Sequence, residues 1–405
     1  MKVVQINAVC DTGSTGRICR ELNDMLMRNG HESIVLYGNG RSEYAFAQKV
    51  TGTFGVKLHA LLSRILGKNA AYSPIATKKI LRVLQSYQPD VVHLHNLHGN
   101  YVSLKLLLQY LAKNDIPTVL TLHDCWFFTG KCTHYTAEGC YKWQTGCHDC
   151  PKLKADIPSY LFDRTGEMWA EKKKLFGAIP RLAVVGVSDW ITNEARRSIL
   201  GEAAIVKTIH NGIDLRVFRP TEENVRGKYC IPAQKKILLG VSAGWSKAKG
   251  LDVFLELAMR LDKEKYQIIL VGTDSSTDAI LPEHIISIHR TENQQELAAL
   301  YTSADLFVNP TRQDSYPTVN MEAIACGIPV VTFQTSGSAE ALDDKTGSVV
   351  AYDDVDALEK EIVRICADKP FAWEDCLAKS VYFNKNERYR DYLDLYDNIT
   401  GCKIC

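Results

Sequence analysis

The chain has 405 residues, of which 46% are hydrophobic and 23% charged, a composition that is ordinary for a soluble globular protein. This length exceeds a single ordinary core and fits two domains of about 150 to 200 residues each. The formal net charge of +1 provides no overall field that would attract nucleic acid, so we expect no nucleic-acid partner. The amino terminus reaches Asp11 before a signal-peptide core forms, and no apolar run of about 18 residues follows. We therefore expect a cytoplasmic protein.

Strands and helices alternate along the first half of the chain. The apolar run 2–9 ends at the glycine turn 13–16, and residues 17–31 then have apolar residues at helical spacing and close on Gly30. Short β-branched runs bounded by turn residues follow at 33–38, 91–96, 117–124 and 183–188. This alternation predicts a buried parallel sheet.

A second α/β pattern follows residue 214. Its strands are expected at 236–242, 267–272, 304–310 and 328–333, and its helices at 250–263, 293–304 and 318–327. The sequence thus predicts two open α/β sheets in series, with ligand crevices outside the carboxyl ends of the strands and facing one another. The predicted parts are a first domain at 1–213 with a cysteine-rich insertion at 125–151, a second domain at 214–385, and a terminal helix at 386–405 that packs back on the first domain.

Two carboxylates in the second domain are candidate ligand-binding groups. Asp314 and Glu322 lie eight positions apart, and Glu322 falls in the opening turns of a predicted helix. Exposed amides at a helix start, together with fixed carboxylates, suit a ligand that carries both phosphate and hydroxyl groups.

The stretch 301–331 that contains these carboxylates resembles the donor-binding signature of family-four retaining glycosyltransferases. That family has two Rossmann-like domains facing across a cleft, the GT-B architecture. The resemblance covers most of the chain. The cysteine-bearing insertion looks like that of a subgroup in bacterial exopolysaccharide, capsule and O-antigen assembly. The matching segments are 13–16, "LHD" at 122–124, "HNGID" at 210–214, "KGLDVFLELA" at 249–258 and "EAIACGIPVV" at 322–331.

The resemblance assigns roles to residues of the second domain. Asp314, where the family normally has glutamate, would hold hydroxyls of the donor sugar, and Glu322 would hold the nucleotide ribose. Pro317 has no backbone N–H, so the amides of Thr318 and Val319 are the candidates for the phosphates. Lys249 and Lys247 occupy the place of the family's basic pair, although Trp245 stands where arginine is often found. In this architecture the leaving phosphates are typically stabilised without a metal, so no catalytic cofactor is expected.

The first domain offers a glycine and a histidine near the same ligand. The amide of Gly16 would approach the phosphates, although two glycines in such a turn are also common for geometry alone. His123 lies just past a predicted strand, and in the family a histidine in this context sits near the anomeric region of the donor sugar. A purely structural hydrogen-bonding role for His123 is the alternative.

The segment "HLHNLHGNY" adds three histidines. His93 and His95 alternate along a strand and so share one face, which suggests either a metal pair or a buried strand flanking an acceptor pocket. Asn96 and His98 are the candidates for the acceptor side.

Four cysteines of the insertion suggest a structural zinc site. Cys132, Cys140, Cys147 and Cys150 are separated by seven, six and two residues, and Cys-x-x-Cys is common in such sites. Four thiolates would close the site and brace the loop after His123, with His134 or His148 as substitute ligands. Reduced free cysteines and disulfides are the alternatives.

Residues 55–84 mix leucine and isoleucine with lysine and arginine. This pattern predicts either a surface that binds anionic lipid at the inner face of the plasma membrane, or ordinary surface helices packed on the core. The predicted function is transfer of a sugar from a nucleotide-diphosphate donor to a hydroxyl of a glycan or lipid-linked acceptor. A sugar-nucleotide epimerase and a non-catalytic scaffold protein of the assembly complex are the alternatives.

Overall fold

In the computed structural model, which describes residues 1–401, the chain divides into two compact units. The first unit comprises Met1–His210 and the residues from Tyr389 onward, and the second comprises Asn211–Arg388. These divisions lie three residues from the predicted boundaries at 213 and 386. The chain therefore passes from one unit to the other twice.

The first unit contains a seven-stranded sheet in the order β3-β2-β1-β4-β5-β6-β7, and all its pairings are parallel. Every residue of β4, β5 and β6 is buried, as expected for a parallel sheet covered on both faces. The strands are β1 (Lys2–Asn7), β2 (Glu32–Tyr37), β3 (Ala47–Lys49), β4 (Val91–Leu94), β5 (Thr118–Leu122), β6 (Leu182–Gly186) and β7 (Ile205–Thr208).

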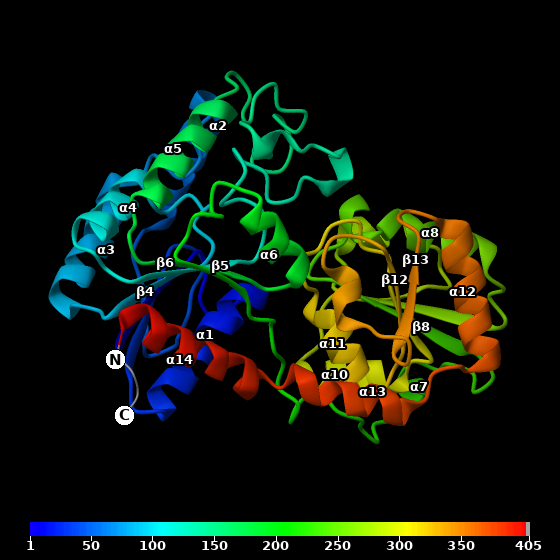
Figure 1. Ribbon diagram of the computed structural model, residues 1–405. Helices are drawn as coiled ribbons and strands as arrows, with labels where there is room; N and C mark the ends of the chain where they lie inside the picture. The colour runs from blue at the N-terminus through cyan, green and yellow to red at the C-terminus, as the bar shows by residue number, and fades with distance from the viewer. Residues whose placement is uncertain (402–405) are drawn as a thin grey trace. The chain divides into compact units, whose positions relative to one another are not determined.

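The terminal helix α14 completes the core of this first unit. Figure 1 shows α14, in red, beside α1. Tyr389, Tyr392 and Tyr396 of α14 are buried in one apolar cluster with Ile18 and Leu22 of α1. The helices of the unit are α1 (Gly13–Arg28), α2 (Thr53–Leu66), α3 (Pro74–Tyr87), α4 (Leu104–Lys113), η1 (Thr136–Glu138), η2 (Lys142–Gln144), α5 (Thr165–Gly177), α6 (Asp189–Arg196) and most of α14 (Lys385–Thr400).

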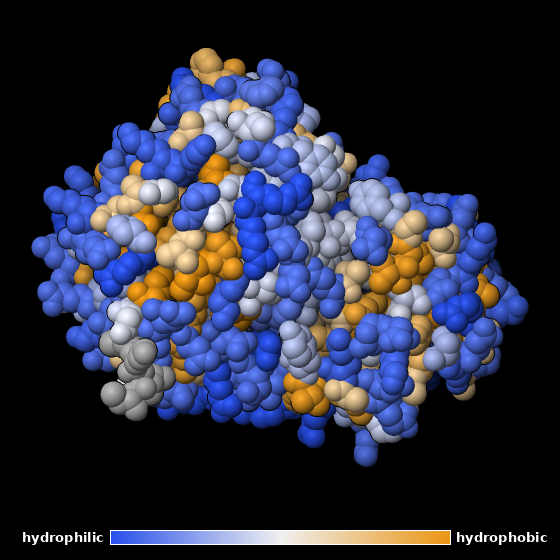
Figure 2. Space-filling model, in the orientation of Figure 1, coloured by the Kyte–Doolittle hydropathy of each residue, from blue (hydrophilic) through white to orange (hydrophobic). Residues whose placement is uncertain are grey.

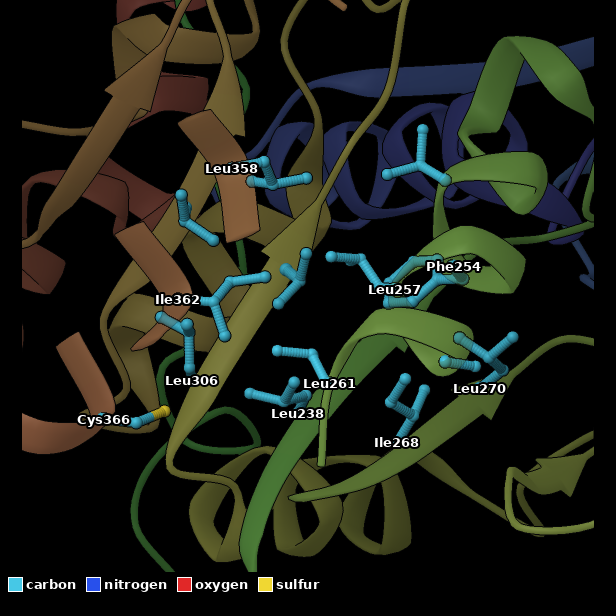
Figure 3. Close-up of a cluster of buried hydrophobic side chains, with 14 of the residues drawn as sticks. Leu238, Phe254, Leu257, Leu261, Ile268, Leu270, Leu306, Leu358, Ile362 and Cys366 are labelled. Carbon is cyan, nitrogen blue, oxygen red and sulfur yellow. The ribbon is translucent and has the colours of Figure 1, made fainter. Parts of the chain in front are cut away.

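The second unit contains a six-stranded parallel sheet in the order β10-β9-β8-β11-β12-β13. Figure 3 shows its main apolar cluster, in which Phe254 and Leu257 of α8 and Ile362 of α12 pack with strand residues Leu238 and Leu270. The strands are β8 (Lys236–Val241), β9 (Tyr266–Val271), β10 (Ile286–Ile288), β11 (Leu306–Asn309), β12 (Val330–Phe333) and β13 (Gly347–Val350).

The helices of the second unit cover this sheet and connect its strands. They are α7 (Val225–Lys228), η3 (Lys247–Lys249), α8 (Leu251–Arg260), α9 (Ser275–Asp278), α10 (Gln294–Ser303), α11 (Thr318–Ala325), η4 (Ser338–Ala341), α12 (Val355–Asp368), α13 (Trp373–Ser380) and η5 (Val381–Phe383).

Each sheet has one point at which the strand order reverses. In the first sheet the reversal lies between β1 and β4, and in the second between β8 and β11. Open α/β sheets bind ligands at such points, outside the carboxyl ends of the strands. The segments that follow these four strands contain Gly16, Asn96 and His98 in the first unit and all the predicted site residues of the second unit. The topology therefore places those residues at two ligand-binding edges, one in each unit.

Helix α2 presents its apolar side to solvent. Its only buried residues are His59 and Ser63, while Phe54 is 80% exposed. Figure 2 shows a small group of apolar atoms at the surface at the top of the first unit, next to hydrophilic ones. Helix α2 therefore departs from an ordinary surface helix packed through its apolar side, whereas α3, in the same predicted stretch 55–84, buries Ile80 and Leu84 as that alternative expects. Among residues 1–401, no helix combines the length and apolarity needed to cross a bilayer.

Candidate active site

Lys249 and Asp314 form an ion pair at the reversal point of the second sheet. Lys249 Nζ donates to Asp314 Oδ2 at 2.6 Å and to the carbonyl of Gln313 at 3.3 Å. Gly250, with φ +78°, ends η3, and a Cβ there would lie 2.4 Å from the carbonyl oxygen of Pro310. Only glycine fits this close, left-handed turn, and the turn brings a lysine after β8 to an aspartate after β11.

Arg312 braces the same turn, and sequence analysis missed it. Its guanidinium donates to Asp252 at 2.7 Å, to Asp353 at 2.8 Å and to the carbonyl of Lys247 at 2.6 Å. The Arg312 amide also donates to the carbonyl of Ala248. The sequence did offer a signal for Arg312, because this cationic residue lies two positions after the strand predicted at 304–310 and within the stretch 301–331 that resembles the donor-binding signature.

Helix α11 begins beside Asp314 with uncapped amides. Pro317 occupies the N-cap position, and no side chain caps the helix. Thr318 and Val319 are partly exposed in its first turn. Backbone N–H groups at a helix start favour an anionic ligand. The predicted phosphate-binding amides thus lie in the loop–helix segment that carries Asp314, whereas the side chain of Lys247 is exposed.

Glu322 lies on α11 and is buried. The hydroxyl of Tyr301 donates to its Oε2 at 3.1 Å, and burial together with Glu322 raises the pKa of Tyr301. Asn320 attaches the helix to the sheet, because it accepts from Asn309 and donates to the carbonyl of Ser338. The carboxylate of Glu322 is therefore held on a fixed helix.

In the first unit, three histidines form a row across β4 and β5. The ring centroids of His93 and His95 are 4.0 Å apart, and those of His95 and His123 are 5.3 Å apart. His123 Nε2 and His95 Nδ1 are hydrogen-bonded at 3.0 Å. Burial lowers the pKa of His123 to about 4, so its imidazole is neutral near pH 7.

The shared face predicted for His93 and His95 is confirmed, because their ring centroids lie 4.0 Å apart. Both nitrogens of His93 are bonded within the protein, to Tyr396 and Thr121 at 2.7 Å each. His95 bonds Gln5 and His123. Since these hydrogen bonds use both nitrogens of both rings, the arrangement favours a buried strand over a metal pair.

The acceptor-side candidates lie in the loop after β4. His98 Nε2 bonds Asp124 Oδ2 at 2.9 Å. Burial lowers the pKa of His98, but Asp124 outweighs it and the pKa is raised above its ordinary value. Asn96 Oδ1 is buried without a hydrogen-bond partner among residues 1–401. The Tyr101 hydroxyl donates to the Asn96 carbonyl at 3.0 Å.

Gly16 lies in the first turn of α1, against the loop that follows β1. A Cβ there would lie 3.1 Å from Val9 Cγ2 and 3.2 Å from the Asp11 nitrogen, and the Gly16 carbonyl accepts from the Asp11 amide. This packing accounts for the glycine, so a contact of Gly16 with a ligand stays a prediction.

Two family models match the chain and together span both sheets. The model described as Glycosyltransferase Family 4 matches residues 15–217, which is half of the chain, and the model described as Glycosyl transferases group 1 matches residues 235–368. The chain is a family-four glycosyltransferase.

The relatives of this glycosyltransferase include a protein provisionally named the colanic acid biosynthesis glycosyl transferase WcaC, from Escherichia coli K12. The two are 23% identical over 98% of this chain and 100% of the relative. A D-inositol 3-phosphate glycosyltransferase of Catenulispora acidiphila is 29% identical over 42% of this chain and 44% of its own.

Solved structures share the GT-B fold along nearly the whole glycosyltransferase. The sucrose-phosphate synthase of Thermosynechococcus elongatus superimposes with a TM-score of 0.73 at 16% identity, covering 99% of this chain and 100% of its own. Anabaena HepE, solved in complex with UDP, gives 0.67 at 15% identity over 98% and 100%. WaaG, involved in lipopolysaccharide biosynthesis, gives 0.66 at 15% identity, also over 98% and 100%.

The cysteine loop of the glycosyltransferase does not gather a closed metal site. Cys132 and Cys150 are hydrogen-bonded, and this contact lowers the pKa of Cys150. Cys147 Sγ instead accepts from the amide of Gly130 at 3.2 Å. Of the sulfurs of Cys132, Cys140, Cys147 and Cys150, no three lie within 4.8 Å of one another. A tetrahedral zinc site of these four sulfurs would require both remaining sulfurs, those of Cys140 and Cys147, to move toward the Cys132–Cys150 pair.

Two buried lysines hold this loop. Lys172 Nζ donates to the carbonyls of Trp126 and Thr129 and lies 3.6 Å from the centroid of the Trp126 ring. Lys131 Nζ donates to three carbonyls of the segment that follows the last cysteine, those of Lys152, Leu153 and Ala155. These ammonium groups tie loop carbonyls to α5 and to one another, a role that sequence analysis did not assign.

Proposed function

We propose that the protein is a retaining glycosyltransferase that moves a sugar from a nucleotide-diphosphate donor to a hydroxyl of a lipid-linked glycan in cell-surface polysaccharide assembly. The observation that carries the proposal is the Lys249–Asp314 pair at the β8/β11 reversal point, beside the uncapped start of α11. Cation, carboxylate and free amides together suit a sugar attached to phosphate. The name of the relative WcaC and the binding of UDP and UDP-glucose by HepE support this assignment.

Each group has a distinct part in the proposed reaction. Lys249 and the amides of Thr318 and Val319 hold the diphosphate, Asp314 orients the sugar hydroxyls, and Glu322 holds the ribose. As the bond from the sugar C1 to the phosphate oxygen breaks, the acceptor oxygen bonds C1 on the same face. The acceptor proton passes to the leaving phosphate oxygen. The lysine and amides stabilise the charge that develops on that phosphate, so this route needs no metal.

Calorimetric titration with UDP-, GDP-, ADP- and TDP-sugars tests the donor site. We expect one donor to bind, and we expect Lys249→Met to weaken its binding at least tenfold, about 1.4 kcal/mol. Glu322→Gln, which keeps the shape of the buried side chain, should weaken the binding of the same donor. Lys360→Met removes an exposed lysine of α12 and should leave binding unchanged.

Measuring sugar transfer to a lipid-linked glycan fraction then distinguishes a glycosyltransferase from the alternative functions. Conversion of the donor sugar without any acceptor would identify an epimerase. Binding of a donor without transfer or conversion would favour a scaffold protein, and no binding of any donor would overturn the proposal at its first step. A product with the anomeric configuration of the donor establishes retention.

We propose that the exposed apolar side of α2 binds the membrane that carries the acceptor. The apolar ridge is defined as Phe54, Leu58, Leu61 and Ile65 of α2 with Tyr160, Leu161 and Phe162, all exposed. The two parts adjoin, because the Tyr160 amide donates to the Arg64 carbonyl at 2.8 Å. Lys57 and Arg64 are exposed on the same helix. Apolar side chains flanked by cations suit the surface of an anionic bilayer.

Co-sedimentation with vesicles tests the apolar ridge. Phosphatidylcholine vesicles that contain phosphatidylglycerol should retain the protein, and pure phosphatidylcholine should retain less. A Phe54→Ser, Leu61→Ser variant should lose the binding. Met259→Ser, on the second unit and 79% exposed in the wild type, should keep it. Equal binding by both variants would refute the membrane surface, and concentration-dependent dimers that the ridge variant abolishes would reassign the ridge to contact between copies.

A further inference from the structure

Gln5, His95 and His123 form a continuous hydrogen-bonded chain from the centre of the first sheet to its ligand-binding edge. Gln5 lies in β1, His95 directly follows β4 and His123 directly follows β5, and these are neighbouring strands. Gln5 and His95 are fully buried, and His123 is partly exposed. The bonds are 3.2 Å from Gln5 Oε1 to His95 Nε2 and 3.0 Å from His95 Nδ1 to His123 Nε2.

The direction of this chain is fixed at its buried end. Gln5 Nε2 donates to the carbonyl of Cys19 at 3.1 Å, and a carbonyl can only accept. The amide of Gln5 is thereby oriented with its oxygen toward His95. Because that oxygen also only accepts, His95 Nε2 must carry the hydrogen of this bond.

The tautomer of His123 follows from that of His95. Burial holds the pKa of His95 well below its usual range, so the neutral ring has one proton, on Nε2, and its Nδ1 accepts. The bond between the two rings then requires His123 Nε2 to donate. His123 Nδ1 has no proton and no hydrogen-bond partner among residues 1–401.

We propose that Gln5 and His95 are positioning residues that hold His123 in its Nε2–H form, so that Nδ1 accepts a hydrogen bond from a substrate hydroxyl. The inference rests on the proposed function for the identity of the substrate. It also names the chemical class that His123 recognises. A phosphate or carbonyl oxygen brings no proton to Nδ1, whereas a sugar hydroxyl does. His123 therefore orients a hydroxyl of the donor sugar or the acceptor and does not hold the diphosphate.

Long-range ¹H–¹⁵N NMR on the full chain labelled in histidine reads each tautomer directly. The signals of His123 are identified by their loss in His123→Asn. In the wild type we expect His123 protonated on Nε2 near pH 7. Gln5→Met removes the acceptor for His95, which frees both rings to exchange tautomers, so the signals should shift toward Nδ1–H. Gln5→Glu keeps an oxygen acceptor in the same place and should restore the wild-type pattern.

Kinetics with the donor found by calorimetry provide the second readout. Gln5→Met should lower kcat by about 10- to 100-fold, by analogy with the loss of the hydrogen-bond partner that orients a metal-bound histidine, with little change in KM for the donor. Gln5→Glu should recover most of kcat. Thr121→Val is the matched control, because Thr121 bonds His93 in the same row and has no bond to His123.

Two outcomes would overturn the inference. One is a wild-type His123 protonated on Nδ1, a result that does not depend on the folding of any Gln5 variant. The other is a Gln5→Met protein with unchanged tautomers and unchanged kcat. If no donor or acceptor supports turnover, the proposed function fails. The NMR signals still decide whether Gln5 and His95 set the tautomer of His123.

Discussion

The geometry of the loops after β8 and β11 depends on the side chain of Arg312. It joins Asp252, Asp353 and the carbonyl of Lys247 through one planar group. Lysine presents a point charge and cannot make this fork of bonds. Whatever loosens the turn before Gly250 also changes where Lys249 meets Asp314.

We predict that Arg312→Lys weakens donor binding and lowers the free energy of unfolding. Its two aspartate partners are partly exposed, so we expect a stability loss of about 1 to 2 kcal/mol. Urea unfolding and calorimetric titration measure the two effects. Arg364→Lys is the control, since Arg364 pairs with Glu361 on the exposed side of α12. A variant with wild-type stability and donor affinity would show that Arg312 does not brace the turn.

The sequence allowed some of these residues to be placed, and others not. Lys249 and Asp314 were predicted separately, and the β8/β11 reversal accounts for their meeting. Arg312 and Gln5 were missed, because their partners are set by how side chains reach across neighbouring strands and loops. The glutamine inside the apolar run 2–9 was the one sequence sign of the hydrogen-bonded chain through His95 and His123, since a polar group in a buried strand must find partners.

At the scale of elements, periodicity predicted the two parallel sheets, and both are confirmed. The start of α1 was misplaced: the glycines expected to form a turn are its first turn, because Gly16 lets the helix approach the preceding loop closely. The exposure of α2 was also not predictable from spacing alone. A regular apolar stripe indicates one face of a helix but not whether that face is covered.

The cysteine loop is expected to depend on Lys172 of α5. Lys172→Met keeps the length of the buried chain but leaves two buried carbonyls without their donor, which should cost about 1 to 3 kcal/mol of stability. Urea unfolding followed by tryptophan fluorescence measures the loss. Lys174→Met, at an exposed position of the same helix, should be neutral. Equal stability of the two variants would contradict the role of Lys172.

The same lysine predicts a pH dependence of stability. Burial lowers its pKa to about 7, against 10.5 for an ordinary lysine. Between these values the unfolded chain binds more protons than the folded one, so the wild-type free energy of unfolding should rise with pH across this window relative to that of Lys172→Met. A constant difference between the two proteins from pH 7 upward would contradict the lowered pKa.

Metal analysis of the purified protein tests the zinc prediction separately. Because lysines and backbone already hold the loop, we expect chelation to leave the thermal midpoint unchanged. One tightly bound zinc per chain, with a lower midpoint after its removal, would instead show that the four sulfurs rearrange around the metal.

At the scale of the whole molecule, the two units differ in how they are assembled from the chain. The second unit is one continuous segment, whereas the first takes its last helix from the far end of the sequence. A fragment of residues 211–388 should therefore unfold cooperatively on its own. A fragment of residues 1–210 should not, because it lacks the buried tyrosines of α14. Circular dichroism during urea titration measures both.

Joining residues 389–401 to residues 1–210 through a flexible glycine-serine linker is the control for this experiment. It should restore cooperative unfolding to the first unit. Cooperative unfolding of residues 1–210 alone would show that α14 adds stability without being required.

The position of α14 also sets an order of events on the ribosome. Domains generally fold as units while the chain is being synthesised. Here the segment made first cannot close its core until the final helix leaves the exit tunnel, so the unit encoded second becomes native first. A chain released before α14 then carries a folded second unit and an incomplete first unit, whose exposed apolar residues mark it for chaperones and proteases. Only a chain that includes α14 yields both units in folded form.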